Sequence, residues 1–198
     1  MLKSYFESKI HSYAQQYFTA HPEVTLVAVT GTIGKSSTKR ALATVLSQAY
    51  RVRMHDQLAN TSFDVDLALL GIEAPAKWRL KDMRLALKAA KYQLKNPPTV
   101  DVIIQDLVVD KAGAMAHYGT YLHPTVAVVT AVTSELLDSF GTLEATAREE
   151  LAVAGIAEYV LINRDDVPGR FANFETNANF NTYGSAGSAE FRVDPQDT

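Results

Sequence analysis

The sequence has 198 residues, 47% of them hydrophobic and 21% charged, with no cysteine and a net charge of −3 at neutral pH. This length and composition suit one domain with its own core and exclude general disorder. They also exclude disulfides, thiolate zinc sites and cysteine nucleophiles, and the charge gives no reason to expect a nucleic-acid partner. No apolar run reaches the ~18 residues that cross a bilayer, and the polar N-terminus is unlike a signal peptide. We therefore expect a cytoplasmic protein.

The first third of the chain begins with a helical pattern. Residues 2–20 place aromatic and aliphatic side chains at spacings of three and four, which predicts an amphipathic helix. His21-Pro22 ends it, because the residue before a proline avoids the helical region. Residues 24–30 form a nearly continuous apolar run rich in β-branched residues, which is typical of a strand buried on both faces. A glycine-containing turn follows, and then a helix over about 35–48.

The strand–helix unit recurs along the rest of the chain. Further strands are predicted at 51–54, 101–107, 125–130 and 159–163. The helices predicted between them lie at 65–72, 75–94, 114–122 and 143–156. Residues 173–188 read as a loop around one short strand. Because strands alternate with helices, we predict a three-layer α/β domain with a mostly parallel sheet and helices on both faces.

The turn after the first strand carries the strongest chemical signal. Gly31 and Gly34 let backbone N–H groups point inward where a side chain would block phosphate oxygens, and the following helix N-terminus adds partial positive charge. Lys35 is placed to reach the terminal phosphates, and the Ser36 hydroxyl to ligate Mg²⁺. Val29 stands where the general phosphate-loop pattern has a glycine, so the form is a variant. We predict nucleotide binding in preference to a plain turn with an incidental lysine.

The segment TGTIGKSST at 30–38 resembles the ATP loop of the Mur ligases, which build the peptidoglycan precursor by ATP-driven amide formation. Four further stretches resemble the family in the same order: 60–70, 101–113 with 123–130, 139–147 and 161–166. The first of them is similar to the segment after the second strand in the D-alanyl-D-alanine-adding ligases. The resemblance spans about residues 24–194.

The resemblance implies a domain organisation. Residues 24–198 correspond to the central ATPase domain, residues 1–23 to an N-terminal amphipathic helix, and residues 75–96 to a basic helical insertion. The family's N-terminal uridine-binding domain and its C-terminal domain are expected to be absent from this chain.

The resemblance also implies an activity: ligation with ATP and Mg²⁺, in which a carboxylate of a cell-wall precursor is activated as an acyl phosphate. It places the nucleotide against Thr30, Gly31, Thr32, Gly34, Lys35, Ser36 and Ser37, its adenine or ribose near Asn163 and Asp166, and the substrate side at Asn60 and Thr61.

Several positions depart from the family pattern. Asp106 replaces a metal-binding glutamate, Leu136 a metal-binding histidine, and Glu150 a lysine that becomes carbamylated. We expect Ser36 and Asp106 to hold a first Mg²⁺ and the second metal site to be altered or lost. Lys35, Asp106 and Glu150 are the candidate catalytic residues. The structural alternatives are that Asp106 caps a helix and that Glu150 lies on a solvated helix face.

Two other functions stay open at this stage. The first is a catalytically impaired nucleotide-binding module that kept the fold and the loop. The second is an amide ligase of the folate-polyglutamate or cyanophycin type.

The helix predicted at 75–94 carries a basic stripe. Its members recur at spacings of four and three: Lys77, Lys81, Arg84, Lys88, Lys91 and Lys95. Pro75 suits the first turn of this helix. The stripe fits a solvated helix face or a peripheral contact with an anionic membrane surface.

Overall fold

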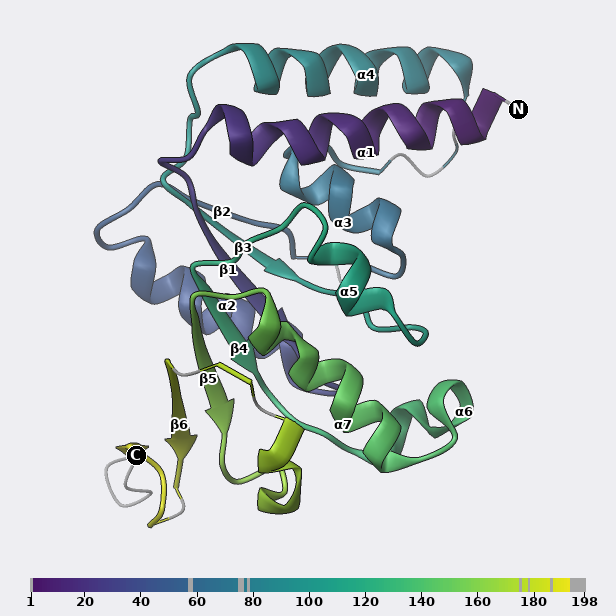
Figure 1. Cartoon of the computed structure of the whole chain (residues 1–198). Coiled ribbons are helices and arrows are strands. Elements are labelled where there is room, and N and C mark those ends of the chain that lie inside the picture. The colour runs from purple at the N-terminus through teal and green to yellow at the C-terminus, as the bar shows by residue number, and fades with distance from the viewer. Residues whose placement is uncertain are drawn as a thin grey trace.

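The computed structural model describes residues 2–56, 59–74, 77, 79–174, 176–177, 179–185 and 187–192. The strands are β1 (Thr25–Thr30), β2 (Val52–Met54), β3 (Val102–Asp106), β4 (Val126–Val129), β5 (Tyr159–Asn163), β6 (Phe180–Gly184) and β7 (Phe191–Arg192). They form one seven-stranded sheet in the order β2-β3-β1-β4-β5-β6-β7, and every neighbouring pair is parallel (Figure 1). The predicted α/β class and parallel sheet are confirmed.

The α-helices are α1 (Leu2–Ala20), α2 (Lys35–Leu46), α3 (Ser62–Leu69), α4 (Leu80–Lys95), α5 (Ala114–Tyr118), α6 (Leu137–Phe140) and α7 (Leu143–Leu151). Short 3₁₀ turns occupy 134–136, 152–155 and 169–174. No helix in the described ranges is both long enough and apolar enough to cross a membrane.

The central strand β1 is buried on both faces, as its apolar run predicts. Leu26 and Ala28 belong to a large core built with residues of α1, α3, α5 and α7. Val27 and Val29 point to the other face, where they join a smaller core packed by α2. Because side chains alternate along a strand, one six-residue segment ties both outer layers to the sheet.

The N-terminal helix α1 is part of the domain core. Ile10, Ala14 and Tyr17 are fully buried in the large core. Helix α4 packs on α1 on the side away from the sheet (Figure 1). At the end of α1, the His21 imidazole lies 3.1 Å from the Gln93 carbonyl oxygen of α4. The described part of the N-terminal segment, residues 2–23, is therefore packed closely against the rest of the domain.

Some predicted helix boundaries are wrong. Helix α3 begins at Ser62 because Thr61 and Asp64 form a capping box, and it ends before Gly71, which has a φ of 68°. Helix α4 begins at Leu80, five residues later than predicted, and at its start the Asp82 carboxylate accepts the Arg79 N–H at 3.1 Å. The expectation that Pro75 occupies the first turn fails for this reason, and Pro75 itself lies outside the described residues. Helix α5 is also shorter than predicted, and α6 was not predicted.

Candidate functional site

The turn between β1 and α2 has the backbone geometry that its glycines predict. Gly31 has a φ of 120° and Gly34 a φ of 86°, both in the region that favours glycine. A Cβ on Gly31 would overlap the Thr130 hydroxyl and lie 2.9 Å from the Ala131 nitrogen. Gly34 is the N-cap of α2 and, having no side chain, makes no capping hydrogen bond to that turn. The N–H groups at this helix start are therefore left to an incoming ligand or to water.

The end of β4 fixes the loop from the side. The Thr130 hydroxyl lies 2.6 Å from the Ile33 carbonyl oxygen and 3.0 Å from that of Thr30. The Thr32 N–H donates to the Ala131 carbonyl oxygen at 3.0 Å. These contacts hold carbonyl groups of the loop against the segment that follows β4. The loop conformation is therefore fixed by the sheet in the absence of a ligand.

Lys35 lies over the loop that precedes it. Its ammonium donates to the carbonyl oxygens of Gly31 at 2.5 Å and Thr32 at 3.3 Å. Ser36 is half-buried beside it and Ser37 is exposed. The sequence predicted that the residues from 30 to 37 form one binding loop, and the structure places them together at the carboxyl end of β1.

Glu150 reaches the loop from α7. Its carboxylate accepts the Gly31 N–H at 2.8 Å and also the Thr30 hydroxyl proton. The side chain is buried, so the alternative of a solvated helix face is wrong. Burial raises the pKa of Glu150, while the hydrogen bond from Thr30 and the charge of Lys35 act in the opposite direction.

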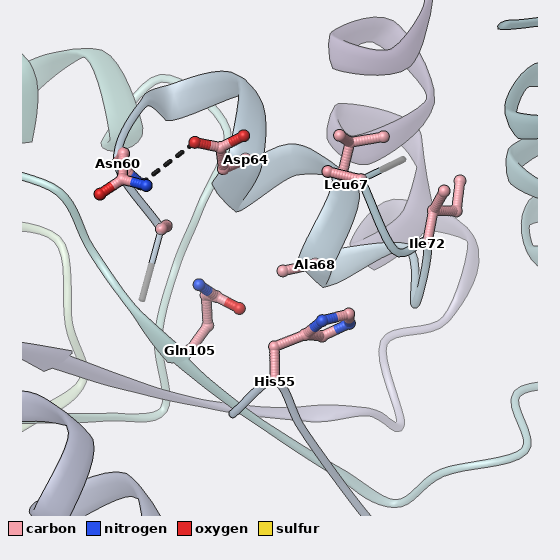
Figure 2. Close-up of a pocket in the computed structure, with 9 residues that line it drawn as sticks. His55, Asn60, Asp64, Leu67, Ala68, Ile72 and Gln105 are labelled. Atoms are coloured by element: carbon pink, nitrogen blue, oxygen red, sulfur yellow. Dashed lines mark hydrogen bonds between the residues drawn. The ribbon is translucent and has the colours of Figure 1, made fainter. Parts of the chain in front are cut away.

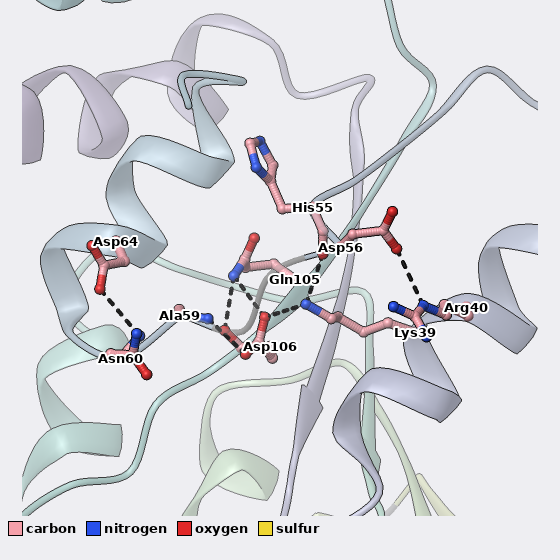
Figure 3. Close-up of polar contacts among 9 residues, drawn as sticks. All are labelled: Lys39, Arg40, His55, Asp56, Ala59, Asn60, Asp64, Gln105 and Asp106. Atoms are coloured by element: carbon pink, nitrogen blue, oxygen red, sulfur yellow. Dashed lines mark hydrogen bonds and ion pairs between the residues drawn. The ribbon is translucent and has the colours of Figure 1, made fainter. Parts of the chain in front are cut away.

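Asp106 ends β3 next to the loop and is paired with a lysine (Figure 3). Its Oδ1 lies 2.6 Å from Nζ of Lys39, and both side chains are at most 1% exposed. Oδ1 also accepts from the Gln105 amide at 3.1 Å, and Oδ2 accepts the Ala59 N–H at 3.2 Å. Lys39 donates in addition to the His55 carbonyl oxygen at 2.9 Å. The pair therefore joins α2, β3 and the segment after β2, and Asp106 caps no helix.

The donor set does not fit a divalent ion bound directly to Asp106 in this arrangement. Both carboxylate oxygens already accept hydrogen bonds, and one of them faces an ammonium. Within the described ranges, no group of three or more His, Asp or Glu side chains is placed to hold a metal. Leu136, where the resemblance implies a histidine, has no side-chain ligand atom. Joint Mg²⁺ binding by Ser36 and Asp106 stays a prediction that requires this ion pair to open.

A cavity of about 180 Å³ (Figure 2) is lined in part by His55, Ala59 and Gln105, which also contact the ion pair. Its polar lining comes from His55 after β2, from Asn60 and Asp64 at the start of α3, and from Gln105 on β3. Burial is the main cause that lowers the pKa of His55, so its imidazole is neutral at neutral pH. The cavity thus offers neutral hydrogen-bonding groups and one carboxylate next to the loop.

The four residues predicted to contact the substrate or the adenine nucleoside line the cavity or form hydrogen bonds within their own segments. Thr61 is the N-cap of α3, where its hydroxyl accepts the Asp64 N–H at 3.2 Å, and Asn60 lines the cavity. Asn163 and Asp166 belong to one turn after β5, in which the Asn163 amide donates to the Asp166 carboxylate at 2.9 Å. The ligand contacts predicted for these four residues stay predictions.

Sequence reasoning missed Lys39, Gln105, His55 and Thr130. For Lys39 the sequence does carry a signal. Lys39 lies three, four and seven residues before Leu42, Ala43 and Leu46, which pack α2 on the sheet, so it occupies the inward face of the helix. For the other three, the position depends on strand pairing that a single sequence does not reveal.

Comparison with known proteins identifies the fold family. The family model described as the Mur ligase middle domain matches residues 29–196. MurF from Acinetobacter baumannii is similar in structure, with a TM-score of 0.67, 14% identity, and coverage of 88% of this chain and 34% of that chain. MurF from Thermotoga maritima in complex with ADP has a TM-score of 0.60 and 18% identity over 91% of this chain and 37% of that one.

An FPGS–AMPPCP complex is also similar, with a TM-score of 0.56 and 18% identity over 91% of this chain and 52% of that one. No curated protein sequence matches the chain. The chain spans about a third of the length of the MurF structures that it matches. From the family model, the loop at the end of β1 and the parallel sheet around it, we conclude that this chain belongs to the Mur ligase family and contains its middle domain.

Proposed function

We propose that the loop from Thr30 to Ser37 binds the phosphates of ATP. The observation that carries this proposal is the glycine loop, held by Thr130 and Glu150, with uncapped helix N–H groups and the Lys35 ammonium at its mouth. Backbone N–H groups and a lysine together form an anion site suited to polyphosphate. The similar structures of T. maritima MurF and FPGS were determined with ADP and AMPPCP, which supports the assignment.

The reaction proposed for the whole protein is ATP-dependent amide formation on a cell-wall precursor, in the cytoplasm. A substrate carboxylate oxygen attacks the γ-phosphorus, the bond to the β–γ bridging oxygen breaks, and ADP leaves. An amine then attacks the acyl phosphate, inorganic phosphate departs, and the amine gives up a proton. In this proposal Lys35 leaves the loop carbonyls to neutralise the β- and γ-phosphates, and the N–H groups at the start of α2 hold them in place.

The substrate side of the proposed reaction lies at the start of α3. Asn60 borders the 180 Å³ cavity that His55 and Gln105 also line. Neutral amide and imidazole groups suit the amide and carboxylate groups of a peptide. We therefore propose that this cavity receives part of the carboxylate substrate, with Asn60 in its lining and Thr61 next to Asn60 at the start of α3. Asn163 and Asp166 are proposed to lie near the adenine or ribose.

A second candidate is a module that binds nucleotide without ligating. Specific observations favour it: Asp106 is neutralised by Lys39, and Leu136 has no ligand atom. Phosphate release by the whole protein with candidate acceptors separates the two functions. Release that depends on an acceptor supports ligation, and nucleotide binding without release supports the module.

Thermal unfolding with and without ADP tests the shared claim of nucleotide binding. A ligand at about 100 times its Kd adds ~2.7 kcal/mol to the free energy of unfolding, which raises the Tm of a domain of this size by roughly 5–10 °C. Lys35→Ala is expected to abolish the rise. The matched control is Arg40→Ala, because Arg40 lies on the same helix but is exposed and pairs with Asp56. No rise in the wild type contradicts both candidate functions.

We also propose that α4 contacts an anionic membrane surface. Its outer face exposes Lys81, Arg84, Lys88, Lys91 and Lys95 together with Leu80, Leu85 and Tyr92. In the described part of the chain none of these cations forms an ion pair, although the chain as a whole is acidic. Exposed cations contribute ~1 kcal/mol each near anionic lipid, and apolar side chains between them enter the interface.

Sedimentation with phosphatidylcholine vesicles, with and without phosphatidylglycerol, tests this contact. We expect binding to the anionic vesicles only, and its loss in Lys88→Glu/Lys91→Glu. Lys9→Glu/Lys111→Glu, which changes two exposed lysines outside α4 and so alters the net charge by the same amount, is the matched control. Equal binding to both vesicles, or binding to neither, contradicts the proposal.

A further inference from the structure

We propose that the ammonium of Lys39 takes the place of a metal ion at Asp106, so that the end of β3 contributes no metal ligand when nucleotide binds. The part that concerns nucleotide rests on the proposed function. The part that concerns the ion pair rests on geometry alone.

The ion pair is enclosed by protein. Lys39 Nζ lies 2.6 Å from Asp106 Oδ1, and the two side chains are 1% and 0% exposed. The carboxylate also accepts hydrogen bonds from Gln105 and from the Ala59 N–H, and the ammonium donates to the His55 carbonyl oxygen. Asp106 and Lys39 thus each form hydrogen bonds with other groups in addition to their ion pair, and Figure 3 shows these contacts around the Asp106 carboxylate.

The position of Lys39 on α2 keeps the ammonium inside. Lys39 shares a helix face with Leu42, Ala43 and Leu46, which pack against Val27 and Ile104 of the sheet. Moving the side chain to solvent would require α2 to shift on the sheet. A long lysine side chain is rarely buried unless it is paired, so this pairing accounts for an otherwise unfavourable position.

Binding a divalent ion at Asp106 would break this arrangement. Mg²⁺ needs a free carboxylate oxygen and close to octahedral geometry. To supply that oxygen, Asp106 would have to release Lys39, and separating an ammonium from a carboxylate inside the core is strongly unfavourable. Asp106 also carries one methylene fewer than the glutamate that the family resemblance places here, so its carboxylate stays nearer to β3 and to Lys39. The ammonium supplies the positive charge that a metal ion would otherwise bring.

The first experiment compares ADP affinity in EDTA and in Mg²⁺ by calorimetry, using the full chain. For the wild type we expect the same Kd in both buffers. For Lys39→Met, which frees Asp106, we expect Mg²⁺ to tighten binding. The control is Arg40→Met on the same helix, which is expected to behave as the wild type. The inference would be overturned if Mg²⁺ tightened ADP binding to the wild type and Asp106→Asn removed this effect. It would also be overturned if Lys39→Met folded but its ADP affinity did not respond to Mg²⁺.

The second experiment does not depend on nucleotide binding. In protein labelled with ¹⁵N-lysine, a buried, hydrogen-bonded ammonium gives a protected side-chain NMR signal, which Lys39→Met assigns by its loss. If that variant does not fold, a nuclear Overhauser cross-peak at short mixing time between this lysine signal and the Asp106 amide proton assigns the signal instead. We expect the signal to persist when Mg²⁺ is added, alone or with ADP. Its disappearance with Mg²⁺ would overturn the inference, whereas absent ADP binding with a persistent signal would contradict only the proposed function.

Discussion

Gly31 is the loop residue that tolerates the least change. Its φ of 120° excludes most side chains, and a Cβ there would overlap Thr130. We expect Gly31→Ala to lower the free energy of unfolding by roughly 2–4 kcal/mol, as strain and overlap add. Chemical unfolding measures this loss.

Gly113→Ala is the matched control for Gly31→Ala. Gly113 also has a positive φ, of 83°, but a Cβ there meets nothing within 4 Å. Its replacement carries backbone strain alone, about 1–2 kcal/mol. Equal losses of unfolding free energy in Gly31→Ala and Gly113→Ala would contradict the tight contact between the loop and the end of β4.

Glu150 makes stability depend on pH. Burial raises its pKa in the folded state above the ordinary value of 4.5, so the folded protein holds this proton more tightly than the unfolded chain. Its contribution is therefore fully present below about pH 4.5 and is lost as pH rises through the folded-state pKa. Glu150→Gln keeps an oxygen that accepts the Gly31 N–H but carries no charge.

We expect Glu150→Gln to gain stability relative to the wild type as pH rises from about 4 to about 8. Urea unfolding at several pH values measures the difference, and Glu149→Gln controls for a neighbouring carboxylate on the same helix. A variant that loses stability relative to the wild type as pH rises would contradict the assignment of a buried carboxylate.

The residue scale also marks the limit of what the sequence predicts. Gly31, Gly34 and Lys35 were predicted because their roles depend on neighbours along the chain. The Lys39–Asp106 pair joins two residues 67 positions apart, so the sequence indicates Asp106 as a candidate metal ligand but does not reveal its lysine partner. Glu150 was named as a candidate, but only packing decides that it faces the loop.

At the scale of elements, α3 is started by local hydrogen bonds. The Thr61 hydroxyl accepts the Asp64 N–H, and the Asp64 carboxylate accepts the Thr61 N–H at 3.0 Å. We expect Thr61→Ala to cost about 1 kcal/mol of unfolding free energy and Thr61→Ser to retain most of it, because serine keeps the acceptor oxygen. Thermal unfolding of both variants checks this. No loss in Thr61→Ala would contradict the cap.

Apolar runs explain which elements the sequence predicted well, and local hydrogen bonds at helix starts explain some of the errors. Strands β1, β3, β4 and β5 are mostly apolar runs, and their predicted bounds are confirmed within a residue or two. The predicted start of helix α4 is too early because the spacing of basic and apolar residues extends back to Lys77. In the structure the helix begins at Leu80, where the Asp82 carboxylate accepts the Arg79 N–H. Helix α6 has four residues, too few for a periodic pattern to appear.

At the scale of the whole molecule, α1 completes the core. The family model begins at residue 29, yet Ile10 in α1 is fully buried in the large core. We expect Ile10→Ala to cost roughly 2–5 kcal/mol and to lower the Tm by roughly 5–15 °C. Tyr5→Ala, at a position that is 59% exposed on the same helix, is expected to change stability by less than about 0.5 kcal/mol. Similar effects of the two substitutions would contradict the packing of α1.

The order of the sheet shows why the site lies where it does. Strand β1 lies between β3 and β4, so the loop after β1 meets Asp106 from one neighbour and Thr130 from the other. Ligands of open parallel sheets bind at the carboxyl ends of the strands. Alternating strands and helices predicted the parallel class, but the order of the strands required the structure.

The central claim is that polyphosphate binds between Gly31 and Ser37. Backbone amide chemical shifts measured during a titration with the ATP analogue AMPPCP test it most directly. We predict that the largest shift changes fall on the amides from Gly31 to Ser37 and that Lys35→Ala removes them. Changes centred elsewhere in the domain, with the loop amides unmoved at saturation, would contradict the account.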